Sequence, residues 1–97
     1  MVGYNYFALI GQIDKIETNI DETKNSVITL NVGRQFREAD GTFAVDSIRV
    51  IVFEHLANIV NDYCKEGQTI HIKGRIQSSI NGNNLIAENI IFMDRGE

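Results

Sequence analysis

The apolar residues between Asp46 and Ile76 change their spacing twice, which constrains the fold more than any other feature of the chain. They alternate with polar residues over 46–53, adopt the spacing of a helix over 55–64, and alternate again after Gly67. Alternation is typical of a strand with one buried face, and a helical stripe is typical of a helix lying on a core. Glycine commonly follows the end of a helix. The stretch therefore predicts a strand, a short helix, a turn and a second strand.

The alternation also assigns faces to the first of these strands. Ile48, Val50 and Val52 point to one side, and Arg49 and Phe53 point to the other. In the helix, an apolar stripe is predicted at four positions: Leu56, Ile59, Val60 and Tyr63. The apolar face of each element should meet a common core, which leaves Arg49 and Phe53 on the outside.

Three more strands are predicted along the chain: one before and one after the polar stretch 14–25, and one at the C-terminal end. We interpret 14–25 as a long turn, with some irregular strand as the alternative for part of it. The predicted strands cover about 5–13, 26–34, 43–53, 69–78 and 85–93, and the helix covers about 55–64. Asp40-Gly41 and Asn81-Gly82 are typical of hairpin turns, and Gly11 inside the first strand indicates a bend.

Five strands with a helix between the third and the fourth predict an all-β OB-fold, a small Greek-key barrel. A four-strand α+β sandwich is the competing architecture. The spacing of the turns excludes a parallel sheet built from strand–helix–strand units. The first and fifth strands are apolar on both faces, so we expect a second chain or another part of this one to cover one face.

The length of 97 residues predicts one domain, and 43% hydrophobic with 23% charged residues is the composition of a globular chain. The single cysteine, Cys64, excludes an internal disulfide, and we interpret it as a buried structural thiol. No apolar run approaches the roughly 20 residues that span a bilayer. The first residues lack the basic region of a signal peptide, so we expect a cytosolic protein with no membrane contact.

The net charge of −4 argues against a polyanionic partner, but the excess of acidic over basic residues lies toward the two ends. Residues 34–75 carry six basic and six acidic side chains and are neutral. A site for a nucleic acid is therefore expected in the middle of the chain.

Four segments in order resemble one protein family. They are Asn5-Tyr-Phe-Ala-Leu-Ile-Gly-Gln-Ile, Val27-Ile-Thr-Leu-Asn-Val, Ile48-Arg-Val-Ile-Val-Phe and Lys65-Glu-Gly-Gln-Thr-Ile-His-Ile-Lys-Gly-Arg-Ile. At these spacings they are similar to the DNA-binding domain of bacterial and phage single-stranded DNA-binding proteins. The resemblance covers residues 5–93 and is most specific over the third strand, the helix and the fourth strand.

This resemblance implies that the chain binds single-stranded DNA during replication, repair or mobile-element transfer, as a homodimer or homotetramer and without a cofactor. The family stacks bases on outer-face aromatic side chains and follows phosphates with basic ones; Phe36, Phe53 and Arg49 match that pattern. Ser47 stands where the family usually has an aromatic residue in the third strand, and the aromatic usual after the fourth strand is missing near Asn81. There is no tryptophan. The sequence ends at Glu97 without the family's acidic tail, so we expect weakened recruitment of replication partners.

Two further groups complete the predicted nucleic-acid-binding residues. Arg34, Phe36 and Arg37 flank the first hairpin, where basic and aromatic side chains are interleaved; the alternative is that Glu38 and Asp40 pair the arginines locally. A second group, Lys73 and Arg75, shares the outer face of the fourth strand with His71, and the alternative there is an ordinary polar sheet face. Stacking does not depend on the 2′-hydroxyl, so single-stranded RNA is an alternative ligand.

A protein adaptor is the alternative function. Such a chain would resemble primosomal replication protein B, a small dimeric relative, and its main ligand would be a protein. Catalysis is not expected, because the sequence contains no nucleophile elbow, phosphate loop or dinucleotide motif. His55, Cys64 and His71 lack the spacing of a zinc site, so no metal is expected.

Overall fold

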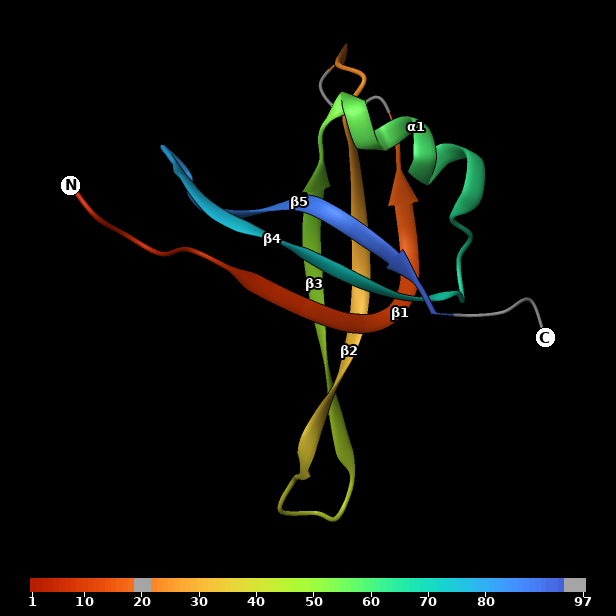
Figure 1. The fold of residues 1–97 in the computed structure, drawn as a ribbon. Coiled ribbons are helices and arrows are strands. Elements are labelled where there is room, and N and C mark those ends of the chain that lie inside the picture. The colour runs from red at the N-terminus through yellow and green to blue at the C-terminus, as the bar shows by residue number, and fades with distance from the viewer. Residues whose placement is uncertain (19–21, 94–97) are drawn as a thin grey trace.

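The structure, a computed structural model, describes residues 1–18 and 22–93. Within these residues the elements are β1 (Phe7–Glu17), β2 (Ser26–Arg37), β3 (Phe43–Val52), α1 (Glu54–Tyr63), β4 (Thr69–Ser79) and β5 (Gly82–Phe92). The strands close into a barrel (Figure 1) in the spatial order β1-β2-β3-β5-β4. The pairing of β3 with β5 is parallel. The predicted fold class, a five-stranded barrel with a helix between its third and fourth strands, is confirmed.

The barrel is filled by every second side chain of its strands. Fully buried aliphatic residues come from three strands, β2, β3 and β4: Ile28, Leu30, Val50, Val52, Ile70 and Ile72. Burial of Val50 and Val52 matches the inward face predicted for β3, and β2 and β4 place alternate residues in the core in the same way, because strand side chains alternate between the two sides of a sheet. The core therefore follows from the period of two in the sequence.

The helix α1 covers one end of the barrel (Figure 1). Its buried face differs from the predicted one. Ala57 and Val60 are buried, and Cys64 follows directly after the helix and is also buried. Ile59 and Tyr63, predicted to lie in the stripe, are exposed instead. The predicted stripe does not include Ala57. Its small side chain allows α1 to lie close to the barrel. Burial raises the pKa of the Cys64 thiol.

The strand β1 continues past the predicted end at Ile13 as far as Glu17. It pairs with β4 over its first half and with β2 over its second half, with an irregularity between Ile13 and Lys15. The irregularity therefore lies after Gly11, where the sequence predicts a bend. Gly11 instead allows β1 to approach β2 closely, because a Cβ atom there would lie 2.6 Å from the Asn31 carbonyl oxygen. Charged outward side chains concealed the second half of this strand from the sequence pattern.

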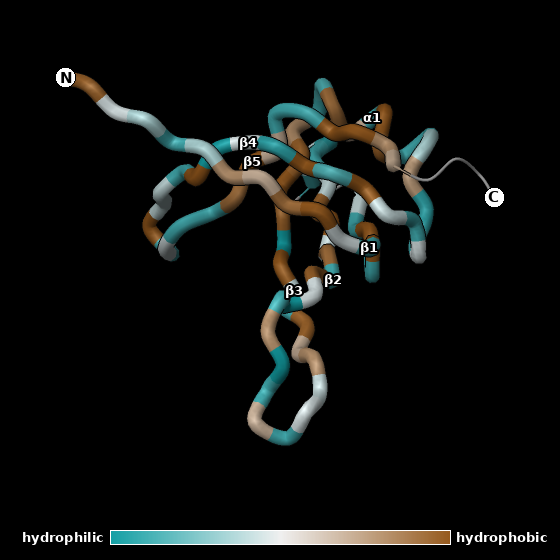
Figure 2. The backbone as a smooth tube through the Cα atoms, turned by 60° about the horizontal axis from the view of Figure 1, so that its bottom comes forward, coloured by the Kyte–Doolittle hydropathy of each residue, from teal (hydrophilic) through white to brown (hydrophobic). Residues whose placement is uncertain are grey.

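Two hairpins extend from the barrel. The β2–β3 hairpin stands well clear of it in both views (Figures 1 and 2), and the β4–β5 hairpin projects in another direction. Their turns occur where the sequence predicts them, at Gly41 and Gly82. These glycines adopt φ angles of +89° and +119°. Glycine is favoured at such angles since other residues meet steric strain there.

The residues before β1 lie along β4. The Asn5 side chain accepts a hydrogen bond from the Ile76 backbone N–H at 2.8 Å and donates one to the Ile76 carbonyl at 2.5 Å. This pair extends the β1–β4 pairing by two positions beyond Phe7. No helix among residues 1–18 and 22–93 is long and apolar enough to cross a bilayer.

Candidate nucleic-acid interface

The outward side chains of β3 form one continuous row. Residues at every second position share this face: Phe43, Val45, Ser47, Arg49, Ile51 and Phe53. We call this row the outer stripe. Phe53 follows the last residue of β3 with extended backbone angles, so the alternation continues through it. The predicted pair Arg49 and Phe53 therefore lies on one face.

Next to one end of the outer stripe the surface has a hollow of about 600 Å³. Its lining comes from β3, the start of β2, the β4–β5 hairpin and the residues before β2: Thr23, Asn25, Val27, Arg49, Ile51, Phe53, Asn81, Asn83, Asn84 and Leu85. We refer to this space as the hollow. It brings Arg49 and Phe53 together with residues that lie more than twenty positions before or after them in the sequence.

The apolar part of the hollow rests on a row that crosses three strands. Val27 on β2 and Ile86 on β5 are both register partners of Ile51 on β3. Val27 is only 4% exposed and Ile86 only 2%, although both lie outside the cluster that fills the barrel. The outer face is therefore locally apolar beside Arg49, which suits the faces of aromatic rings or bases.

Phe53 has a backbone role that leaves its side chain available. Its carbonyl oxygen accepts hydrogen bonds from the N–H groups of Leu56 and Ala57, each at 2.9 Å, and so begins α1. Its side chain forms no cap on the helix and lines the hollow. Phe53 does not plug the barrel beneath the helix, because it is not among the buried core residues.

Arg49 is 65% exposed in its side chain, and its Nη2 atom lies 3.8 Å from a carboxylate oxygen of Glu17. Glu17 is also 3.8 Å from the Nζ atom of Lys15, so one acid serves two cations. Exposed pairs of this length contribute little stability. A phosphate could therefore replace Glu17 as the partner of Arg49 at small cost.

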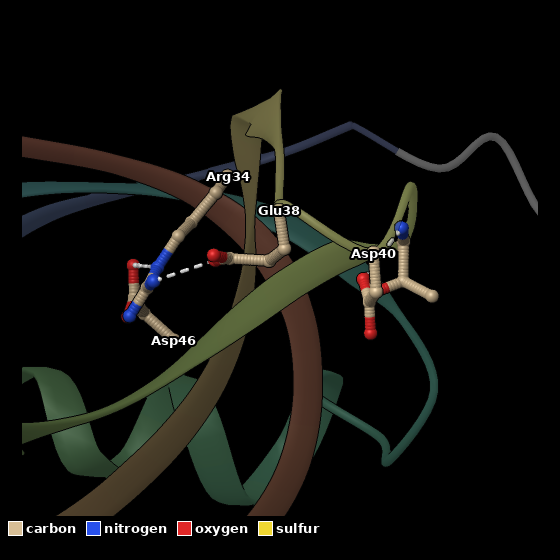
Figure 3. A network of polar contacts seen from close by, with 5 residues as sticks. Arg34, Glu38, Asp40 and Asp46 are labelled. Carbon is tan, nitrogen blue, oxygen red and sulfur yellow. Dashed lines mark hydrogen bonds and ion pairs between the residues drawn. The ribbon is translucent and has the colours of Figure 1, made fainter.

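On the β2–β3 hairpin, the charge of Arg34 is already matched (Figure 3). Its guanidinium lies 2.8 Å from Asp46 and 3.0 Å from Glu38. The hydrogen bonds with Asp46 raise the pKa of Arg34 and lower the pKa of Asp46. The alternative in which nearby acids pair the hairpin arginines therefore applies to Arg34. Its partners are Glu38, as that alternative has it, and Asp46 in place of Asp40.

Arg37 and Phe36 lie near the tip of the same hairpin. Arg37 forms no ion pair with any residue that the structure describes; it donates to the Gly41 carbonyl at 2.9 Å and lies 4.7 Å from the centre of the Phe43 ring. Phe36 is 80% exposed. The tip therefore presents a cation and two aromatic rings without an acidic partner for the cation.

Phe43 is a further candidate site residue that the sequence analysis did not predict. It is 54% exposed, it belongs to the outer stripe, and it is the register partner of Arg37. Counting back from Phe53 in steps of two would have reached it. Three asparagines of the second hairpin, Asn81, Asn83 and Asn84, were also missed as site residues, because the run was interpreted only as a turn.

Lys73 and Arg75 lie apart from the hollow. They are on β4, and β5 stands between β4 and β3 in the barrel order. Arg75 forms an ion pair with Glu88 at 3.1 Å, whereas Lys73 forms no ion pair within the described part of the chain. The structure thus gathers Arg49 and Phe53 at the hollow and Arg34, Phe36 and Arg37 on the hairpin. Lys73 and Arg75 do not line the hollow, although Arg75 is the register partner of Ile86 in the row beside it. In residues 1–18 and 22–93 no three His, Cys, Asp or Glu side chains come together to hold a metal ion.

Residues 4–88 match the model of the single-strand binding protein family. Single-stranded DNA-binding protein 1 of Streptococcus pyogenes serotype M18 is 33% identical over 78 residues, which are 76% of this chain and 59% of that protein. Single-stranded DNA-binding protein 1 of Staphylococcus aureus strain COL is 32% identical over 77 residues, with coverage of 76% and 46%. The chain spans about half the length of these curated relatives.

Solved structures agree with the barrel. The Plasmodium falciparum single-stranded DNA-binding protein in complex with single-stranded DNA superposes with a TM-score of 0.75 at 17% identity, covering 97% of this chain and 98% of that chain. A mitochondrial single-stranded DNA-binding protein from S. cerevisiae gives 0.73 at 13% identity, covering 98% and 100%. At these identities the similarity demonstrates the shared fold.

Proposed function

This chain belongs to the single-strand binding protein family, and we propose that it binds single-stranded DNA of any sequence by stacking bases and contacting phosphates. It would protect transient single strands during replication, repair or mobile-element transfer, in the cytoplasm and without catalytic activity. The relatives reported above are all named as single-stranded DNA-binding proteins. The protein-adaptor alternative is therefore not favoured.

The outer stripe is the observation that supports this proposal most strongly. From Phe43 to Phe53 it spans ten steps of extended chain from one residue to the next, or about 33 Å. It carries an aromatic ring at each end and Arg49 between them, and Arg37 lies over the first ring. Rings for bases and cations for phosphates are what a sequence-tolerant single-strand groove requires.

The charges support binding of moderate strength. Arg37 and Lys73 have no acidic partner in the described residues, whereas Arg34 and Arg75 each have one within 3.1 Å. Each phosphate that a free cation neutralises releases counterions, so affinity should fall with salt. Because few cations are free, we expect a shallower salt dependence than that of a strongly basic protein.

We also propose that the chain assembles as a homodimer or homotetramer. Apolar side chains are exposed on the outer side of the β1–β4–β5 wall, where Ile10 and Ile91 flank His71 in register. Tyr4 and Tyr6 stack on each other nearby in the sequence, with ring centres 6.3 Å apart. Light scattering after size exclusion tests this: Ile10→Lys should lower the measured mass, and an unchanged monomer mass for both proteins would reject assembly.

Fluorescence anisotropy of an end-labelled thymidine oligomer of about 35 nucleotides, several site sizes of an OB-fold, tests DNA binding. The label belongs on the DNA because the protein has no tryptophan. Titrations at low and moderate salt should give micromolar or tighter binding that weakens with salt, and unlabelled duplex should compete poorly. Absence of binding at low salt would reject the proposal and return the adaptor function to first place.

A further inference from the structure

Asparagine side chains surround the hollow on two sides. Asn25 lies before β2, and Asn81, Asn83 and Asn84 belong to the β4–β5 hairpin. The Asn84 amide nitrogen donates to the Ser79 hydroxyl at 3.2 Å. Among the residues that the structure describes, the side-chain amides of the other three have no hydrogen-bond partner. These amides come from segments more than fifty residues apart, so they meet only through the fold.

The chemistry of this lining suits a base better than a phosphate. Arg49 is the one charged residue of the described chain that lines the hollow. Val27, Ile51 and Phe53 offer an apolar floor and a ring for the face of a base. Each free amide offers a donor next to an acceptor, which is the pattern found on the edges of bases.

We propose that the hollow is a base-reading subsite in which free asparagine amides hydrogen-bond the edge of one stacked base and favour adenine. This inference rests on the proposed function and adds a graded base preference to it. Stacking alone tolerates every base, because each has a π face. Amides that reach the base edge would make one position along the strand discriminate.

Adenine fits these amides on more than one edge. Its 6-amino group is a donor beside the N7 acceptor on one edge and beside the N1 acceptor on another, and asparagine pairs with such edges through two hydrogen bonds. Cytosine and thymine are smaller, so they also cover less of the Phe53 ring. The volume of about 600 Å³ leaves room for a purine.

Competition binding tests the inference. A labelled thymidine oligomer of about 12 nucleotides, within one OB-fold site size, is displaced by unlabelled oligomers of equal length. The competitors are all-thymidine, the same oligomer with three evenly spaced adenines, and one with unsubstituted purine, which lacks the 6-amino group, at those positions. We expect adenine to improve competition about fivefold and the purine without its amino group to lose that gain.

Two variants assign the gain to the amides. Asn83→Leu and Asn25→Leu keep the size of the side chain and remove its hydrogen bonds, and they alter different segments. Each should reduce the adenine gain, which is measured within the same variant as the competition by the adenine oligomer relative to the all-thymidine oligomer, since stacking persists for both. Asn89→Leu, an exposed asparagine of β5 outside the hollow, is the control and should keep the gain.

The outcomes separate this inference from the proposed function. Equal competition by all oligomers would overturn the base-reading subsite and leave single-strand binding intact. An adenine gain that persists in both leucine variants at the hollow would also overturn it, because another feature would then be reading the base. Failure of every oligomer to bind would reject the proposed function and this inference together.

Discussion

The guanidinium group of Arg34 donates to the carboxylate of Asp46 from both Nε and Nη2, with the shortest contact at 2.8 Å. Asp46 is the register partner of Val32, so this contact joins β2 to β3 where the hairpin leaves the barrel. It satisfies the charge of Arg34 within the protein. Among the hairpin arginines, Arg37 is therefore the better candidate for phosphate contact.

The pH dependence of the hairpin should follow from this contact. Arg34 holds the pKa of Asp46 below its ordinary value of 3.8. A lowered pKa in the folded state means that the contact stabilises the protein above pH 3.8 and loses its effect as pH falls through the folded-state pKa. Carboxyl-carbon NMR should show Asp46 titrating below 3.8, and Arg34→Gln should move its midpoint upward.

Asp40 provides the internal control for this titration. Its pKa is lowered by hydrogen bonds from Thr42, which the Arg34→Gln change leaves in place. The Asp40 midpoint should therefore stay constant in the variant. If Asp46 titrates at the same pH with and without Arg34, the contact does not persist in solution.

Removing Arg37 should reduce the salt dependence of DNA binding. This residue has no acidic partner in the described chain, so Arg37→Ala should lower the slope of log affinity against log salt by about 1. Lys65→Ala makes the same charge change in the turn after α1 and should leave the slope unchanged. Equal slopes for wild type and Arg37→Ala in anisotropy titrations would place the hairpin tip outside the DNA path.

Phe53 should contribute stacking energy at the hollow. Phe53→Ala should weaken binding of thymidine oligomers by about 1–3 kcal/mol, or about 5- to 150-fold, with stability little changed because the side chain does not cap α1. Adding Arg49→Ala should abolish binding at moderate salt. Tyr63→Ala, an exposed aromatic on α1, should bind like wild type. A double variant with unaltered affinity would show that the binding site lies elsewhere.

Gly74 should tolerate no side chain. A Cβ atom there would overlap the Ile86 carbonyl oxygen and meet the Phe7 ring. Gly74→Ala should therefore lower the free energy of unfolding in urea by about 3 kcal/mol or more. Gly33→Ala is the matched control, because it meets nothing within 4 Å and should be neutral or slightly stabilising. Equal midpoints for the two variants would contradict the close approach of β4 and β5.

Several local features could be predicted from the sequence because their causes are local. A period of two identified the inward face of β3, and the two glycine turns occur at Gly41 and Gly82. The same pattern placed Arg49 and Phe53 on one face. The pattern did not predict two features. Charged residues interrupt the alternation in the second half of β1, and the buried face of α1 includes Ala57, which the predicted stripe does not.

By itself, the sequence determined the fold class, the family and the outward row of β3, because alternation, turn residues and ordered motifs are written along the chain. Only the tertiary structure decided which rows of outward side chains lie next to one another. Barrel closure places β5 between β3 and β4, so Arg49 and Lys73 are separated although one helix joins their strands. It also brings Asn25 and Asn83 to one hollow and gives Arg34 its partner Asp46. Strand pairing across a closed barrel is non-local, and no periodicity along the chain encodes it.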